Sequence, residues 1–238
     1  MSIRTEIAIP WRDTGDPHRR EALAYVLAHY ARLGSAAFPT SVTLGDTQSR
    51  RFSRTGARNA AAEGAGDWDV LVMADADCVV QGEVLEHAVE LAHRTRKVIL
   101  PHDRFMELTQ EGTQLALAEY EIARWQHDWC QLAEYERKRP SGVIVFPRKA
   151  WELVGGYDER FKGWGFEDTA MLWNIEDLAY GWERLSGRIW HLWHPPASTT
   201  WLKSDKQLFE RYKLAHGDPV KMYALLLERQ RQDARLTA

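Results

Sequence analysis

Residues 68–77 have the sequence WDVLVMADAD, in which an apolar run ends directly at two carboxylates. The run predicts a buried strand over Asp67–Ala74. Ile3–Ile9 and Ser41–Leu44 have the pattern of earlier short strands, and apolar residues recur at helical spacing over Glu21–Leu33. Strands that alternate with helices in this way predict an α/β fold, with a mostly parallel, Rossmann-like central sheet flanked by helices.

In sheets of this kind, ligands bind beyond the carboxyl ends of the strands. The loops expected there are Pro10–Asp16, Asp46–Asn59 and Asp75–Cys78, all of them polar and charged. The sequence has neither GxGxxG nor GxxxxGK[ST], so neither a dinucleotide site nor a P-loop is predicted. The candidates for binding a nucleotide diphosphate in these loops are Pro10, Arg12, Asp13, Asp46, Arg54, Asn59 and Asp75.

Asp75 and Asp77 are also candidate metal ligands, because carboxylates that follow a buried strand suit Mn²⁺ or Mg²⁺ bound together with phosphates. Acidic pairs at strand ends also occur as caps or solvated turns. His191 and His194 lie in HLWHPP, at the end of a strand expected over Arg188–His191. Imidazole binds Mn²⁺ well, so either histidine could complete the site, although a single histidine more often only forms hydrogen bonds.

Gly155–Met171, GGYDERFKGWGFEDTAM, places Trp164 between two glycines and then opens an expected helix with Glu167 and Asp168. An indole face can stack on a sugar, and a nearby carboxylate can take the proton of a sugar hydroxyl. The segment therefore predicts an acceptor site with a general base.

The remaining elements complete one predicted domain over residues 1–203. A helical extension over 204–238 is expected to pack on it as a lid, an oligomer surface or a packing strap. The other expected elements are helices over Gly82–Arg94 and Glu107 to about Arg139, strands over Lys97–Pro101 and Gly142–Phe146, and two tail helices that break near Gly217.

The composition of the 238 residues, with a formal net charge of -3, gives no overall attraction to nucleic acid or to an anionic membrane. The two cysteines lack the spacing of a metal site or a disulfide framework, which favours a reducing cytoplasm. No apolar run is long enough to span a membrane.

The segments IPWRD, FSRTGARN, VLVMADADCVV, GWGFED and HLWH, in this order, resemble a metal-dependent glycosyltransferase of the GT-A fold. The chain is most similar to family-two glycosyltransferases and to the galactosyltransferase and polypeptide N-acetylgalactosaminyltransferase C-terminal region. The resemblance covers roughly residues 3–195 and rests on GWGxED together with the DxD of residues 75–77.

For the donor half, the resemblance places Arg12 and Asp13 at the nucleotide pocket and Arg54 near the diphosphate. Asp75 and Asp77 match the DxD motif, with Asp77 the more direct metal ligand. His191 or His194 matches the later metal-binding histidine.

For the acceptor half, the resemblance implies that Trp164 lies against donor and acceptor, with Gly163 and Gly142 also on the acceptor side. Asp168 matches the catalytic base of inverting members, and Glu167 would support the acceptor. Ser53 replaces the usual Asn of the family's FNRA segment, and Thr169 and Ala170 follow the acidic pair where galactosyltransferases continue acidic. These departures leave the acceptor open.

The predicted function is transfer of a sugar, with inversion, from a nucleotide-diphosphate donor such as a UDP-sugar to an acceptor hydroxyl, with Mn²⁺ or Mg²⁺ as cofactor. A saccharide is the first acceptor class and a modified nucleic-acid base another. The alternatives are a catalytically silent carbohydrate- or nucleotide-binding module and a metal-dependent nucleotidyltransferase, which has no use for Trp164. A glycosidase pair leaves the arginines, the DxD and the histidines unexplained.

Overall fold

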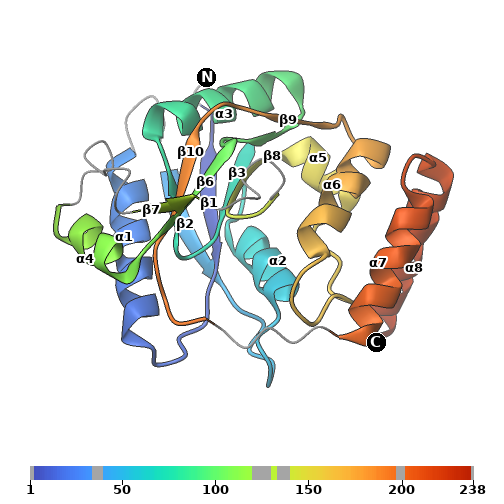
Figure 1. Ribbon diagram of the computed structural model, residues 1–238. Coiled ribbons are helices and arrows are strands. Elements are labelled where there is room, and N and C mark those ends of the chain that lie inside the picture. Colours follow the sequence, from blue (N-terminus) through green and yellow to red (C-terminus); the bar gives the residue numbers. More distant parts are fainter. Residues whose placement is uncertain (1–2, 34–39, 120–129, 133–139, 197–201, 237–238) are drawn as a thin grey trace.

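A six-stranded sheet runs through the centre of the computed structural model, which describes residues 3–33, 40–119, 130–132, 140–196 and 202–236 (Figure 1). Within this sheet β8 is antiparallel to β3 and β5, while the other neighbouring strands are parallel. The predicted mostly parallel α/β fold is therefore confirmed. In spatial order the strands are β2 (Thr40–Gly45), β1 (Thr5–Pro10), β3 (Val70–Ala74), β8 (Val143–Pro147), β5 (Val98–Leu100) and β9 (Trp182–Arg184).

Helices cover both faces of this sheet because its strands are apolar on both sides. Ile7 and Ile9 face one core, which α1 (Pro17–Leu33) and α3 (Gly82–Thr95) close. Ala8, between them, faces the other core, as the two-residue period of a strand requires. That second core is closed by α2 (Arg54–Gly64), α5 (Arg148–Val154) and α6 (Glu167–Leu178).

Helix α2 replaces much of the loop expected over Asp46–Asn59. Ser53 caps it, since its hydroxyl accepts a hydrogen bond from Gly56 N at 3.3 Å. The helix lies directly on the end of β2: a Cβ added to Gly45 would come within 2.2 Å of Ala61 N. Arg54 and Asn59 were expected in a loop, and this close packing instead fixes them on a helix at the carboxyl edge of the sheet.

A second, four-stranded sheet has the order β4 (Cys78–Val80), β10 (Arg188–His191), β6 (Arg104–Leu108) and β7 (Cys130–Leu132). The prediction of a helix from Glu107 to about Arg139 is wrong where β6 and β7 lie. Because β6 and β7 pair with each other across the intervening chain, residues 107–108 and 130–132 are strands. Only α4 (Gln110–Glu119) is helical among the described residues of this segment, and 120–129 and 133–139 lie outside the description.

The tail forms two helices, α7 (Lys203–Ala215) and α8 (Pro219–Leu236), which lie beside α6 on the side away from the sheet (Figure 1). The expected break falls between them. Their apolar residues form a third core cluster that includes Phe161, Ala170, Leu208, Tyr212 and Met222. The division into a domain over 1–203 and an extension over 204–238 stays a prediction. No helix in the described ranges has the length and hydrophobicity needed to cross a bilayer.

Candidate active site

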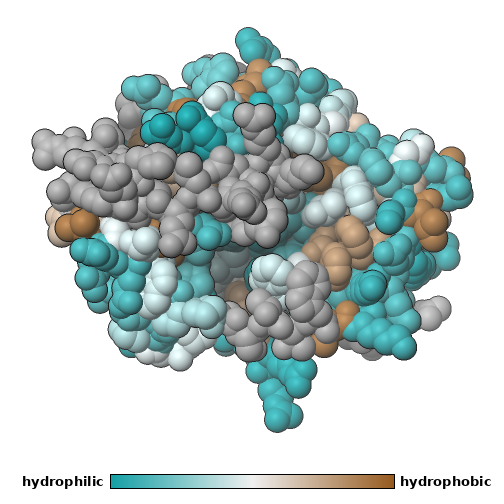
Figure 2. Space-filling model, in the orientation of Figure 1, coloured by the Kyte–Doolittle hydropathy of each residue, from teal (hydrophilic) through white to brown (hydrophobic). Residues whose placement is uncertain are grey.

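The carboxyl ends of β1, β2 and β3 meet at one edge of the central sheet because these strands are parallel and in register. Pro10 ends β1 opposite Gly45, and Trp11 N donates a hydrogen bond to Gly45 O at 2.9 Å. The surface is hollowed in front of α2, beside an apolar patch over α6 and α7 (Figure 2). The predicted site residues are therefore expected around this edge.

Arg58 of α2 is the centre of the first cluster, although its side chain is only 2% exposed. Its Nη1 lies 2.7 Å from Asp168 Oδ1 and 3.8 Å from Glu167 Oε1, while its Nη2 lies 3.0 Å from Asp75 Oδ1. The guanidinium also lies over the ring of Tyr157, 4.8 Å from its centroid. One buried cation thus joins the carboxyl end of β3 to the first turn of α6.

Arg54 lies one helical turn before Arg58, so the two point the same way from α2. Its Nη2 is 3.4 Å from Glu167 Oε1, and its guanidinium lies 5.9 Å from the centroid of Trp164. Trp164 is 42% exposed. The predicted stacking residue and the predicted acidic pair are therefore neighbours around α2.

Burial raises the pKa of Asp168 to about 7, and the carboxylates of Glu167 and Asp75 add to this, whereas Arg58 acts in the opposite direction. A carboxylate with a pKa near the working pH is both ionised and basic enough to accept a proton. Tyr157 Oη lies 3.4 Å from the same Oδ1 that Arg58 contacts. Both hydrogen bonds to the Asp168 carboxylate among the described residues fall on Oδ1, and its side chain is 14% exposed.

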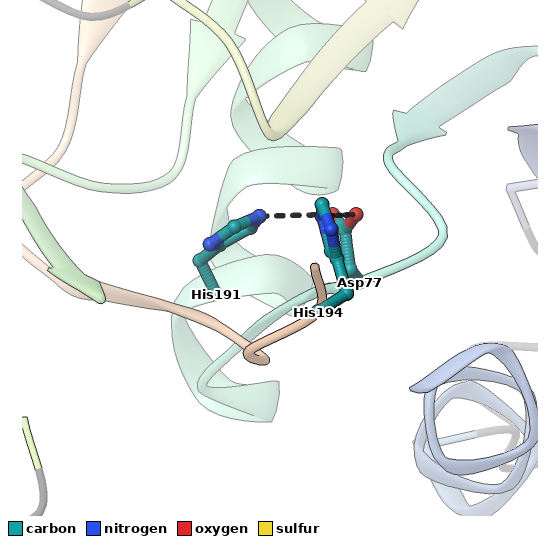
Figure 3. Close-up of side chains that lie close together, drawn as sticks. All are labelled: Asp77, His191 and His194. Carbon is teal, nitrogen blue, oxygen red and sulfur yellow. Dashed lines mark ion pairs between the residues drawn. The ribbon is translucent and has the colours of Figure 1, made fainter. Parts of the chain in front are cut away.

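The second cluster consists of Asp77, His191 and His194 (Figure 3). Asp77 Oδ2 lies 3.0 Å from His194 Nε2, and Oδ1 lies 3.6 Å from His191 Nε2. One ligand atom from each residue falls within 4.8 Å of the others. Two imidazole nitrogens and a carboxylate oxygen form a donor set for a divalent transition-metal ion, and both histidines, rather than one, lie beside Asp77.

Strand pairing builds this second cluster. His191 of β10 lies opposite Cys78 of β4, and Leu192 N donates to Asp77 O at 2.8 Å. Burial opposes ionisation of Asp77, but His191 and His194 outweigh it and hold the pKa of Asp77 well below its usual range. Burial likewise opposes the charge on His191, whose pKa Asp77 raises. Asp77 is therefore a carboxylate, the form that binds metal.

Asp75 lies between the two clusters but belongs to the first. Its carboxylate contacts Arg58, and its backbone N–H donates to Gly142 O at 2.7 Å. It is not part of the group formed by Asp77 and the two histidines. The two aspartates of the DxD turn have different partners: Asp75 contacts Arg58, whereas Asp77 contacts the histidines. The role of Asp75 as a metal ligand stays a prediction.

The predicted donor residues in the first two loops divide into two sets. Arg12 forms two hydrogen bonds to Asp46, at 2.6 and 2.7 Å, and thereby lowers the pKa of Asp46. This pair joins the ends of β1 and β2 at the edge described above. Asp13 instead turns to Arg20 of α1, 2.8 Å away and half exposed.

Asn59 and Gly142 have close contacts within the protein, and their predicted binding roles stay predictions. The Asn59 side chain donates to Tyr157 O at 2.9 Å and to Glu159 at 3.0 Å, and its Oδ1 accepts from Tyr157 N at 2.9 Å. Both N–H donors of its amide are thus used within the protein. Gly142 is buried, and an added Cβ would lie 2.4 Å from Ile189 Cδ1, so close packing explains this glycine better than acceptor binding.

Sequence reasoning placed Arg58 only among the arginines of a diphosphate-binding loop, and it missed Tyr157 and Asp205. Arg58 could have been found from its four-residue spacing to Arg54, had α2 been expected to begin at Arg54. Asp205 accepts hydrogen bonds from the backbone of Lys162 and Gly163, the predicted acceptor residue. No sequence pattern indicates a contact of that range.

Part of the chain matches a known family. The family model of the N-terminal domain of galactosyltransferase matches residues 129–196, which include Trp164, Asp168 and both histidines. No curated protein matches the chain.

Three solved structures are similar in fold. The catalytic domain of Drosophila beta1,4-galactosyltransferase 7 in complex with xylobiose has a TM-score of 0.57 and 14% identity over 87% of this chain and 79% of that chain. A variant of that Drosophila enzyme in complex with manganese, UDP-Gal and xylobiose has a TM-score of 0.52 and 15% identity over 86% and 78%. GalNAc-T7 with UDP, GalNAc and Mn²⁺ has a TM-score of 0.53 and 14% identity over 96% of this chain but only 55% of that chain.

At these identities the likeness establishes the fold. The family model describes a glycosyltransferase, and the three similar structures are of glycosyltransferases, two of which contain manganese. This chain therefore has the GT-A glycosyltransferase fold, as its sequence resemblance predicted.

Proposed function

We propose that this chain is a metal-dependent inverting glycosyltransferase that moves a sugar from a UDP-sugar to an acceptor hydroxyl. The observation that carries the proposal is the contact of one guanidinium, that of Arg58, with both Asp75 and Asp168. A donor diphosphate would bind at the end of β3. Through Arg58, this end is linked to Asp168, the carboxylate whose pKa is about 7. Donor site and base therefore form one reaction centre.

Asp168 would accept the proton of the acceptor hydroxyl through Oδ2 as the hydroxyl oxygen attacks the anomeric carbon and the bond to the diphosphate breaks. Arg58 fixes the orientation of the base by holding Oδ1. A Mn²⁺ held by Asp77, His191 and His194 would neutralise charge on the departing diphosphate. General-base catalysis of this kind typically contributes about 10²- to 10⁴-fold in rate.

The donor is proposed to lie along the edge where Arg12 and Asp46 join β1 to β2, with Arg54 toward the diphosphate. Two similar structures are complexes with UDP-Gal or UDP, which supports a uridine nucleotide. The 42% exposure of Trp164 supports a saccharide acceptor, since indole stacks well on the C–H face of a pyranose. Glu167 and Gly163 lie beside Trp164 and remain proposed acceptor-side residues.

A cytoplasmic site of action is part of the same proposal. Cys78 is a buried free thiol, as is usual in a reducing compartment.

The test is to incubate the protein with Mn²⁺ and a panel of UDP-sugars, first alone and then with saccharide acceptors, and to measure released UDP. The Asp168→Asn variant is the matched negative control. Acceptor-dependent UDP release by the wild type alone is expected. Silence with every donor and metal, together with intact UDP binding, would favour a silent binding module. Release of pyrophosphate from nucleotide triphosphates would favour the nucleotidyltransferase.

A further inference from the structure

The C-terminal helices hold the segment that carries Trp164 and Asp168. Asp205 lies in the first turn of α7 and is fully buried. Its Oδ1 accepts a hydrogen bond from Lys162 N at 3.2 Å, and its Oδ2 accepts one from Gly163 N. A buried carboxylate that accepts two backbone N–H groups fixes the backbone immediately before Trp164.

A second contact of α7 falls on Phe166, between Trp164 and the acidic pair. Phe166 has φ +75°, a region that residues other than glycine rarely adopt, and it directly precedes the first turn of α6. The ring of Phe209 stacks on it with centroids 4.6 Å apart. Such strained residues persist where the surroundings fix them, and they cluster at functional sites.

Helix α8 fastens the beginning of the same segment. Arg229, only 3% exposed, donates to the carbonyls of Val154 at 2.9 Å, Gly155 at 2.7 Å and Gly156 at 3.1 Å. The two helices therefore contact residues 154–166 at both ends.

We propose that α7 and α8 are a positioning element for the acceptor half of the site, with Asp205 as its principal positioning residue. Asp205 fixes the backbone of Gly163 and hence the face of Trp164, while Phe209 fixes Phe166 and hence the direction from which Asp168 enters α6. This role rests on the proposed function. Of the three roles that the sequence left open for the tail, namely a lid, an oligomer surface or a packing strap, it corresponds to the packing strap.

The experiment compares Asp205→Asn and Phe209→Leu with the control Asp177→Asn. Asp177 also accepts a backbone N–H, that of Gly217 at 3.1 Å, and also joins α6 to the C-terminal helices. It lies at the opposite end of α6, however, far from Asp168. Asp205→Asn is expected to lower kcat/KM for a saccharide acceptor at least tenfold, and Phe209→Leu about threefold. KM for the UDP-sugar should change less than twofold, and the control should keep wild-type activity.

Amide hydrogen exchange provides a readout that does not need turnover. Exchange at residues 162–168 should be faster in Asp205→Asn and Phe209→Leu than in Asp177→Asn. Wild-type acceptor kinetics and unchanged exchange in both α7 variants would overturn the proposal. If Asp205→Asn does not fold, Phe209→Leu decides alone. If the wild type transfers no sugar, the proposed function fails, while the exchange data still show whether α7 fixes this segment.

Discussion

Asp77 and Asp168 are two largely buried carboxylates on either side of Asp75, yet their pKa values move in opposite directions. The pKa of Asp77 is held well below its usual range, whereas that of Asp168 is raised to about 7. Burial acts upward on both. The difference lies in the neighbours: Asp77 faces two imidazoles, while Asp168 shares Arg58 with Asp75 and Glu167. The neighbouring groups, rather than depth of burial, therefore make the pKa values of these two carboxylates differ.

The largest effect is expected from Asp168→Asn, because an amide cannot accept the proton at neutral pH. We expect kcat to fall roughly 10³-fold, with UDP affinity within about twofold of wild type by calorimetry. Asp177→Asn on the same helix is the matched control. Near-normal turnover by Asp168→Asn would show that the high-pKa carboxylate is not the base.

The role of Asp77 in this comparison is tested by removing the metal ion or the Asp77 carboxylate. Chelation should abolish turnover, and added Mn²⁺ should restore it. Asp77→Asn should weaken Mn²⁺ binding by about tenfold or more. Loss of a residue that only orients a metal ligand already weakens metal binding by about this factor, and Asp77 is proposed to bind the ion directly. Paramagnetic titration of Mn²⁺ measures this directly. Equal Mn²⁺ affinity in the variant and wild type would exclude Asp77 as a ligand.

The pH dependence of kcat/KM tests the pKa of the base in the free enzyme. Asp168 is active when ionised, and its pKa is raised to about 7, so activity should fall about tenfold for each pH unit below 7 and level off above it. Folding monitored by circular dichroism over the same range is the control. A midpoint near pH 4 would mean that neither burial nor the carboxylates around Arg58 raise the pKa of Asp168.

The smallest effect is expected at Arg12, on the donor edge. Because two hydrogen bonds already pair it with Asp46, less of its charge is available to a donor. Arg12→Ala should raise KM for the UDP-sugar by about fivefold, corresponding to a loss of about 1 kcal/mol, and should leave kcat unchanged. A larger fall in kcat than in affinity would place Arg12 at the reacting atoms instead.

Sequence patterns predicted the strand-end positions of this site well, because buried strands have apolar runs and end at polar residues. Asp75 directly follows β3, as predicted, whereas His191 ends β10 of the second sheet, where it pairs with Cys78, the neighbour of Asp77. The acidic pair likewise opens a helix, as expected.

Contacts between distant segments could not be predicted in the same way. Arg58 was assigned to a loop because the segment after Ser53 lacks strong apolar periodicity, and its burial depends on Gly45 allowing α2 onto β2. The strands over 104–108 and 130–132 were missed because each depends on pairing with the other. The partnership of Asp205 with Gly163 is a long-range contact of the same kind.

The pairing of β4 with β10 has a consequence for how the chain folds. More than 110 residues separate Asp77 from His191 in the sequence, and closing so long a loop costs conformational entropy before any contact offsets it. A nascent chain cannot complete the Asp77 cluster until residue 194 has been made. A divalent ion bound there binds the folded chain alone, and at a hundredfold excess over its Kd it would stabilise the fold by about 2.7 kcal/mol. The cofactor would then also act as a late cross-link between the first and last thirds of the protein.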